Sequence, residues 1–239
     1  MGRPYYSRIK KQWHEVTGNR GGSFKKYVLN DYLIEKIGGI NEQALLELGA
    51  GNGYFMPLLC QRYSGQVPSR IVISDLSGAL LEIAQREFSL RGAEYVQLDV
   101  RNEFPFDNET FDLILATMVF NEVSSPAFKS ALNESWRILK QHGRLIITVT
   151  HPQFVERIQK NGKLSQLGPN FWTMPSIGSL RLPVVLRSEK QYMSAIKQAG
   201  FNFECESLFP TAEVLNERPG LRYSKDIPLA LVFNCSKKG

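Results

Sequence analysis

Short apolar runs alternate with longer amphipathic segments through the first 150 residues, and this rhythm constrains the fold more than any other feature of the chain. The runs are continuously apolar and rich in aliphatic residues, as strands buried on both faces of a sheet are. The five runs are Ala44–Leu48, Arg70–Ser74, Glu94–Leu98, Phe111–Ala116 and Arg144–Thr150. Apolar residues at helical spacing fill the gaps between them. Strands that alternate with helices predict a parallel, doubly wound α/β sheet.

The segment before the fifth run carries helix-end signals. Ser125 followed by Pro126 has the form of an N-cap with proline at the first helical position, and Gly143 is expected to end that helix. After Thr150 the rhythm breaks, because residues 151–187 combine scattered aromatic residues with prolines and glycines. We interpret this segment as an insertion over one edge of the sheet.

The C-terminal part returns to regular structure. Ser188 and Gln191 have the spacing of a capping box, and Gly200 ends the helix that they open. The runs Phe203–Leu208 and Leu229–Asn234 are expected to be the last two of seven strands. The predicted units are an N-terminal helical arm or lid (1–30), a core (31–150), a substrate-side insertion (151–187) and a C-terminal completion of the sheet (188–239).

The net charge of +6 belongs to the N-terminal arm. Residues 1–26 hold seven of the 29 basic residues and one of the 23 acidic residues, so the remainder is neutral. Such an arm either contacts or steers an anion, or is the solvated face of an amphipathic helix. A nucleic-acid enzyme more often spreads positive charge over its main body, so we do not expect a nucleic-acid partner.

Composition excludes several other classes. Hydrophobic residues make up 43% of the chain, too many for a disordered protein. No apolar stretch approaches the roughly 18 residues of a membrane span, and the N-terminus lacks the apolar core of a secretory signal. The three cysteines form no paired or zinc-type motif, which predicts a reducing, cytoplasmic setting and no metal.

A glycine-rich loop, 46–55, follows the first strand and opens a helix. Its glycines let the backbone approach a ligand, and the N–H groups at the helix start then face that ligand. A nucleoside triphosphate loop would need a lysine followed by serine or threonine. A dinucleotide loop would need a glycine or alanine where Tyr54 stands, so an NAD enzyme is not favoured. The observed pattern is acid-x-Gly-x-Gly-x-Gly, with Glu47 as the acid.

Glu47-Leu-Gly-Ala-Gly-Asn-Gly53 resembles motif I of the class I S-adenosylmethionine-dependent methyltransferases, whose core is Rossmann-like. Ile73-Ser-Asp-Leu-Ser77, Gln97-Leu-Asp-Val100 and Phe111–Thr117 resemble the ends of that family's second, third and fourth strands. Residues 137–146 resemble the turn into its fifth strand, with glutamine and histidine replacing the usual Pro-Gly. Five such motifs in order make the resemblance specific. It is greatest for the small-molecule branch, which often has a Tyr-x-Leu-Asn element, here Tyr27–Asn30, and a His-Pro-x-Phe element, here His151–Phe154.

The resemblance implies S-adenosylmethionine as cofactor. The implied cofactor-binding residues are Tyr27, Glu47, Gly49, Ala50, Gly51, Asn52, Gly53, Asp75, Leu76, Asp99, Val100 and Thr117. Asp75 is expected at the ribose, although it also suits the cap of the following helix. Asp99 is expected near the adenine, or is a turn residue. Glu47 either contacts the amino group of the methionine moiety or orders the glycine loop.

Methyl transfer from a sulfonium is an in-line displacement in which alignment supplies much of the acceleration. A base is needed only where the acceptor must lose a proton. We expect His151 to contact the substrate or act as that base, unless it only holds its loop. His14, Glu122, Phe154 and Trp172 are further expected substrate contacts.

The sequence therefore predicts methyl transfer to nitrogen or oxygen of a small, apolar or aromatic molecule. The aromatic residues of 151–187 suit such an acceptor, or form the insertion's own small core. A nucleic-acid methyltransferase and an inactive cofactor-binding scaffold are the alternatives. The oligomeric state stays open.

Overall fold

The computed structural model describes residues 4–168, 171–175 and 180–237. Its main sheet has seven strands in the order β3-β2-β1-β4-β5-β10-β9. The bounds are β1 Ala44–Leu48, β2 Arg70–Asp75, β3 Ala93–Gln97, β4 Phe111–Thr117, β5 Leu139–Thr150, β9 Phe201–Leu208 and β10 Ala230–Lys237. Strand β10 runs antiparallel between β5 and β9, and the other neighbours are parallel. The predicted seven-stranded, mostly parallel sheet is confirmed.

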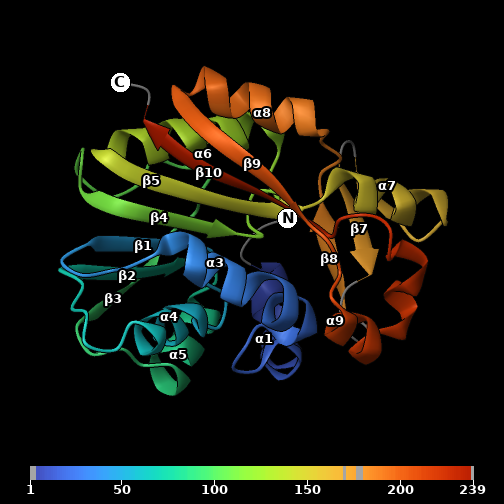
Figure 1. Cartoon of the computed structure of the whole chain (residues 1–239), viewed down its shortest axis with the longest axis horizontal. Helices are drawn as coiled ribbons and strands as arrows, with labels where there is room; N and C mark the ends of the chain where they lie inside the picture. The colour runs from blue at the N-terminus through green and yellow to red at the C-terminus, as the bar shows by residue number, and fades with distance from the viewer. Residues whose placement is uncertain (1–3, 169–170, 176–179, 238–239) are drawn as a thin grey trace.

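Helices cover both faces of this sheet (Figure 1). Helices α6 (Ser125–Ile138) and α8 (Glu189–Gln198) lie on one face. Helices α3 (Asn30–Ile37), α4 (Phe55–Arg62) and α5 (Gly78–Glu87) lie on the other. Because successive strand residues face opposite sides, each strand contributes to two buried clusters. The sheet is therefore the middle layer of three.

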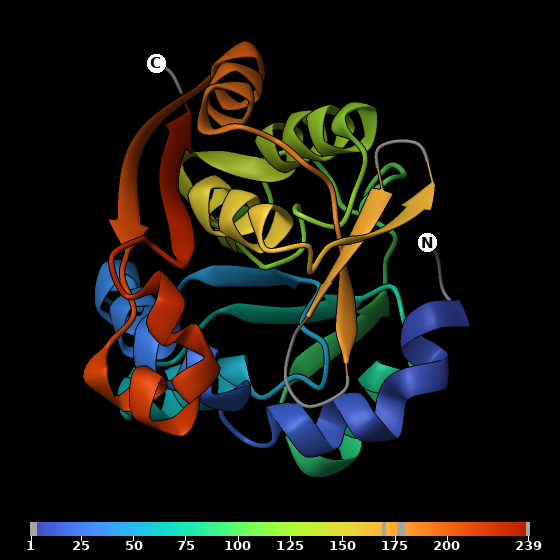
Figure 2. The same ribbon diagram turned by 90° about the vertical axis from the view of Figure 1, so that its right-hand side faces the viewer.

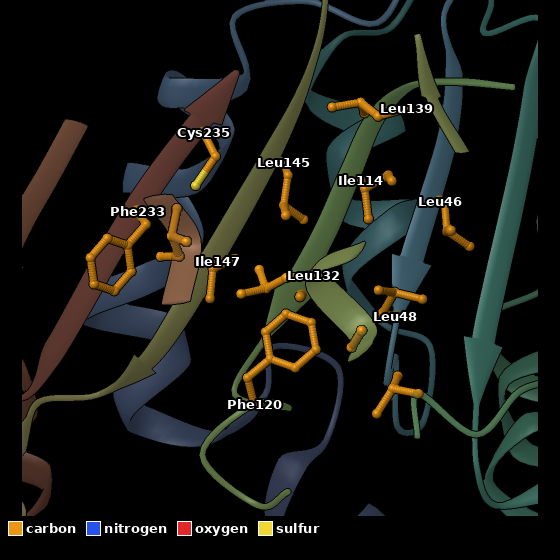
Figure 3. Close-up of a cluster of buried hydrophobic side chains, with 14 of the residues drawn as sticks. Leu46, Leu48, Ile114, Phe120, Leu132, Leu139, Leu145, Ile147, Phe233 and Cys235 are labelled. Atoms are coloured by element: carbon orange, nitrogen blue, oxygen red, sulfur yellow. The ribbon is translucent and has the colours of Figure 1, made fainter. Parts of the chain in front are cut away.

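The cluster beneath α6 and α8 is built from alternate strand residues (Figure 3). Leu46 of β1, Ile114 of β4, Leu145 of β5 and Phe233 of β10 all belong to it, and Leu132 of α6 packs among them. All are at most 1% exposed. The continuous apolar runs of the sequence thus reflect burial on both faces.

Helix ends agree with the sequence in one case and differ in another. Ser188 and Gln191 form the predicted capping box at the start of α8. The cap of α6 is Ser124 and not Ser125, because the Ser124 hydroxyl accepts the Ala127 N–H. Gly143 does not end α6. The helix stops at Ile138, and Gly143 lies within β5, where a Cβ would lie 3.0 Å from the Phe111 carbonyl oxygen.

The described residues of 151–187 form a helix and strands that the sequence did not indicate. Helix α7 (Pro152–Lys160) leads into an antiparallel sheet of β6 (Ser165–Gly168), β7 (Phe171–Pro175) and β8 (Arg181–Val184). Together with α9 (Ala212–Glu217) and the 3-10 helix η2 (Pro219–Ser224), these elements face the viewer in Figure 2. The expected position over an edge of the sheet is wrong. The insertion lies across the carboxyl ends of the strands, where the Val185 N–H donates to the Asn121 carbonyl in the loop after β4 (2.8 Å).

The N-terminal arm consists of α1 (Pro4–Thr17), the short α2 (Gly22–Phe24) and one π-helical turn, η1 (Lys25–Leu29), which continues into α3. Helix α1 packs against α5 beside the carboxyl end of β2. Within the described ranges, no helix has both the length and the apolar character needed to cross a membrane.

We predict that Leu132→Ala lowers the free energy of unfolding by about 2–5 kcal/mol, because it leaves a cavity in a fully buried cluster. Urea denaturation measures this change. Leu167→Ala is the control, since Leu167 is 47% exposed, and it is expected to change stability by less than about 0.5 kcal/mol. Equal effects of the two substitutions would contradict the three-layer packing.

Candidate active site

A cavity of about 700 Å³ lies at the carboxyl ends of the strands, between the core, the arm and the insertion. Ligands of doubly wound sheets bind at this end of the strands. Several residues predicted from the sequence line it: Gly49, Ala50, Gly51, Asn52, Asp75, Leu76, Asp99, Val100, Thr117, Glu122 and Phe154. The others are not part of the lining: His14, Tyr27, Glu47, Gly53, His151 and Trp172.

The glycines of the loop after β1 have different tasks. Gly49 has a φ of +65°, and a Cβ there would lie 2.2 Å from Val119 Cγ2. Gly53 has a φ of +77°, and a Cβ there would lie 2.4 Å from the Cβ of Ala84 in α5. Gly49 therefore shapes the cavity wall, whereas Gly53 lets the loop pack against a helix.

Asp75, at the end of β2, ties this loop to the next helix. One of its carboxylate oxygens accepts the Gly51 N–H and the other accepts the Ser77 N–H, each at 2.8 Å. Burial raises the pKa of Asp75 to about 6, and the two backbone hydrogen bonds and nearby Lys25 partly offset that rise. Asp75 lines the cavity and supports the start of α5 through Ser77, which is the cap residue of that helix, and its contact with the ribose stays a prediction.

Asp99 lines the cavity after β3 and belongs to a tight turn. Its carboxylate accepts the Arg101 N–H at 3.0 Å and binds the Arg101 guanidinium at 2.8 and 2.5 Å. The predicted turn role is therefore present. The Arg101 side chain lines the cavity beside it.

Glu47, buried in β1, and Lys25, which lines the cavity, influence each other electrostatically. Burial raises the pKa of Glu47 to about 8, against the opposing effect of Lys25. Burial lowers the pKa of Lys25, and the carboxylates of Glu47, Glu122 and Asp75 act against that. The sequence placed an excess of charge in the arm but did not single out Lys25, whose position depends on the π-helical turn η1.

The loop after β4 forms another part of the wall. Met118 has a φ of +62°, a left-handed conformation that is rare for a residue with a side chain and is concentrated at functional sites. Arg187 fixes this loop, because its guanidinium donates to the carbonyl oxygens of Phe120 and Val123, both at 2.9 Å. Glu122 lies between those two anchored residues. Sequence reasoning found Glu122 but missed Met118 and Arg187, which carry no local motif.

The arm closes the side of the cavity nearest α5. Trp13 lines the cavity, with its Nε1 3.2 Å from where a Cβ on Gly51 would lie. His14 points away, with its Nε2 2.6 Å from a Glu87 carboxylate oxygen and its Nδ1 3.3 Å from the Asn52 amide nitrogen. His14 thus fastens the arm to α5 and the glycine loop. Its expected role as a substrate contact is not supported.

Two further predicted residues face other partners. The Tyr27 hydroxyl donates to Glu217 Oε1 and accepts from Lys26 Nζ, which links η1 to α9. Trp172 lies in the small sheet opposite Val184. Neither belongs to the lining, although Phe171 and Met174, the neighbours of Trp172 in β7, do.

His151 begins α7 instead of facing the cavity. It is 1% exposed, and its Nδ1 accepts the Gln153 N–H at 3.2 Å. Its Nε2 lies 3.2 Å from Ser207 Oγ and 3.3 Å from Glu189 Oε1. An imidazole held from both nitrogens and pointing to β9 is poorly placed to receive a proton from a substrate. The structure favours the structural role that the sequence left open.

The insertion gives the cavity an apolar side. Phe154 and Ile158 of α7, Met174 of β7 and Leu182 of β8 line it, together with Leu221 of η2. Phe154, Ile158 and Leu221 also belong to a separate buried cluster with α9. The aromatic and aliphatic residues of the insertion therefore form a small core and a cavity wall at once.

Comparison with known proteins agrees with this geometry. Residues 46–147 match the family described as a methyltransferase domain. Over 189 residues, the chain is 28% identical to the demethylmenaquinone methyltransferase of Thermotoga maritima, covering 74% of this chain and 78% of that protein. Over 120 residues, it is 28% identical to a ubiquinone/menaquinone biosynthesis C-methyltransferase of Idiomarina loihiensis, covering 48% of this chain and 46% of that protein. A solved S-adenosylmethionine-dependent methyltransferase from Mesorhizobium loti has a TM-score of 0.66 at 18% identity, covering 85% of this chain and 95% of that chain.

The fold and the strand-end cavity define a Rossmann-like enzyme with a glycine loop after its first strand. Residues 46–147 are a methyltransferase domain, and the fold is the one that a solved S-adenosylmethionine-dependent methyltransferase has. The residues fit S-adenosylmethionine as a cofactor. Glu47 Oε2 is buried with no hydrogen-bond partner among the described residues, which suits an ammonium group. Gly49 lines the cavity and has no side chain, so a ligand can approach its backbone closely.

The raised pKa of Glu47 predicts a pH-dependent stability. The folded state binds the Glu47 proton more tightly than the unfolded state, so its contribution to stability is present below about pH 4.3 and is lost as pH rises toward 8. In the cofactor-free protein, Glu47→Gln should therefore gain stability relative to the wild type across this window. Urea unfolding at pH 5, 6.5 and 8 measures the difference. Glu35→Gln, at an exposed site on α3, should give a difference that does not change with pH, and the same constant difference for Glu47→Gln would contradict the assignment.

Proposed function

We propose that this enzyme transfers the methyl group of S-adenosylmethionine to a small, largely apolar or aromatic molecule. One observation carries the proposal: a single cavity is lined on one side by Gly49, Asp75 and Asp99 and on the other by the apolar residues of the insertion. A cofactor and a flat acceptor can thus lie in one enclosed space, which an in-line displacement requires.

The proposed cofactor contacts follow from the donors and acceptors present. When bound, S-adenosylmethionine supplies an electrophilic methyl group on a sulfonium. Each carboxylate oxygen of Asp75 accepts one backbone N–H and retains capacity for a ribose hydroxyl. Asp99 lines the next part of the cavity and is proposed for the adenine side. Glu47 is proposed to accept from the amino group of the methionine moiety, and Trp13 to cover the glycine loop.

The chain's own residues would act on the acceptor chiefly by holding it and excluding water. Phe154, Met174 and Leu182 would hold its apolar body. Glu122, where the loop after β4 meets the insertion, is proposed to contact the acceptor near the reacting atom. In this proposal residues 1–30 serve as a lid, 31–150 hold the cofactor, 151–187 contact the acceptor and 188–239 complete the sheet.

The relatives bear on the acceptor class. The Thermotoga protein is named for demethylmenaquinone and the Idiomarina protein is named a C-methyltransferase. A flat ring compound therefore suits this cavity. Ring carbon joins the nitrogen and oxygen that the sequence favoured as candidate acceptor atoms.

Cofactor binding is tested first by thermal shift with S-adenosylmethionine, S-adenosylhomocysteine and NAD. A ligand at 100 times its Kd stabilises by about 2.7 kcal/mol, which is about 5–10 °C in Tm for a chain of this size. We expect this shift with both sulfur ligands and none with NAD. Asp75→Asn should weaken S-adenosylhomocysteine binding about tenfold or more, because it removes the negative charge and one of the two oxygens proposed to accept hydrogen bonds from the ribose. Asp31→Asn, at an exposed site on α3, should not. A shift with NAD alone would contradict the cofactor contacts.

Turnover is tested with 1,4-naphthohydroquinone, 2-naphthol and 2-naphthylamine, following S-adenosylhomocysteine formation and identifying the methylated atom by NMR. We expect at least one methylated product. Leu182→Asn should raise the KM for that acceptor about tenfold, since it replaces an apolar contact, and should leave S-adenosylhomocysteine affinity unchanged. Leu186→Asn is the matched control, because Leu186 is 38% exposed and outside the lining. Cofactor binding without any product would favour the inactive scaffold instead.

A further inference from the structure

Two cationic residues stand at the insertion end of the cavity. Lys163 follows α7, and its Nζ lies 4.6 Å from the centroid of the Tyr223 ring. Arg218 follows α9 and precedes η2, and both cations line the cavity with Tyr223. The Tyr223 carbonyl oxygen accepts from the Arg157 guanidinium of α7 at 2.7 Å, which fixes the turn that carries these groups. Helix α7 and the segment of η2 that lines the cavity are therefore held together.

The four cations that line the cavity in the described part of the chain stand in two settings. Lys25 and Arg101 lie near the carboxylates at the core end, whereas Lys163 and Arg218 lie at the insertion end.

The three carboxylates of the cavity, Asp75, Asp99 and Glu122, all lie at or after the ends of core strands. Among the described residues of the insertion, α9 and η2 that line the cavity, none is acidic. Asp75 and Asp99 line the end where a cationic cofactor is proposed to bind, and Glu122 lies where the core meets the insertion. Lys163 and Arg218 face the apolar surface proposed for the acceptor.

The setting of Arg218 strengthens this point. Burial lowers the pKa of Arg218 below its ordinary value, and the nearby Tyr223 acts in the opposite direction. A partly desolvated guanidinium gains more from an anionic partner than one in bulk water, and its planar donors match an oxyanion. An anionic acceptor would supply that gain at the insertion end of the cavity.

We propose that the methyl acceptor carries an oxyanion, a carboxylate or a phosphate, which Arg218 and Lys163 bind while the insertion holds its flat apolar body. This inference rests on the proposed function and narrows its substrate class to amphipathic acids. It also separates this enzyme from relatives named for quinones, because the anion would select against uncharged rings of the same shape. Arg218 and Lys163 thus become specificity-determining residues.

The test uses the full-length protein saturated with S-adenosylhomocysteine and four probes that share one ring system. They are naphthalene-2-carboxylate, 2-naphthyl phosphate, naphthalene-2-carboxamide and naphthalen-2-ylmethylammonium, and calorimetry measures the affinity of each. We expect at least one anion to bind about tenfold or more tightly than the amide, because hydrogen bonds to charged groups are the stronger ones. The ammonium probe should bind weakest. The order of the two anions decides which oxyanion the site takes.

Variants locate the effect. Arg218→Gln combined with Lys163→Met should reduce anion affinity to that of the amide and leave amide affinity unchanged, and Arg218→Lys with Lys163 intact should recover part of the preference. Arg222→Gln and Lys160→Met are matched controls, because both residues are exposed on the same segments and lie outside the lining. Thermal unfolding and S-adenosylhomocysteine affinity verify that each variant is folded.

The outcomes separate this inference from the proposed function. If the wild-type protein does not bind S-adenosylhomocysteine, the proposed function itself is overturned. Normal cofactor binding with equal affinity for amide and anion, or with no binding of any probe, would overturn only the anionic acceptor. A preference that survives the double substitution would also overturn the assignment to Arg218 and Lys163.

Discussion

The carboxylate of Asp75 is the contact on which the cofactor end of the molecule depends. Its two oxygens accept backbone N–H groups from the glycine loop and from the start of α5, so one side chain fixes two adjacent βα connections. A buried carboxylate is costly unless it is hydrogen-bonded, and these two bonds are what allow it to remain at the strand end. Replacing it by a hydrophobic residue would leave both N–H groups without a partner. Asp75 therefore both holds the glycine loop in place and supplies a carboxylate to the site.

The acidic side chains of the site also have a basic neighbour. Lys25 interacts electrostatically with Glu47, Asp75 and Glu122, and it lies on the π-helical turn of the arm, far from them in the sequence. Single-turn π-helices are often found at functional sites. Here Lys25 lines the cavity while Val28 and Leu29 of the same turn are buried. The positive charge of the arm is thus partly an internal counterion to the core carboxylates.

The sequence predicted what local patterning determines. The apolar runs identified every strand of the main sheet, with ends within five residues of those observed. In the central strands β1 and β4, burial on both faces leaves little alternation to misread. Asp75 and Asp99 could be placed because a residue at the end of a parallel strand has only one edge to occupy. Tyr27, His14 and His151 could not, since their orientation depends on partners distant in the chain, namely Glu217, Glu87 and Ser207.

The insertion escaped prediction for a physical reason that also bears on its role. Its small sheet satisfies its own backbone hydrogen bonds between short, partly exposed strands, so its sequence needs no long apolar period. Arg187 joins the insertion to the core. Its guanidinium donates hydrogen bonds to the loop around Glu122, and its Cζ lies 4.8 Å from the ring centroids of both Phe128 and Tyr192. That anchor fixes where the acceptor surface meets the strand ends. The residues beyond the anchor can differ without disturbing the main sheet, which lets one cofactor-binding core serve acceptors of different chemistry.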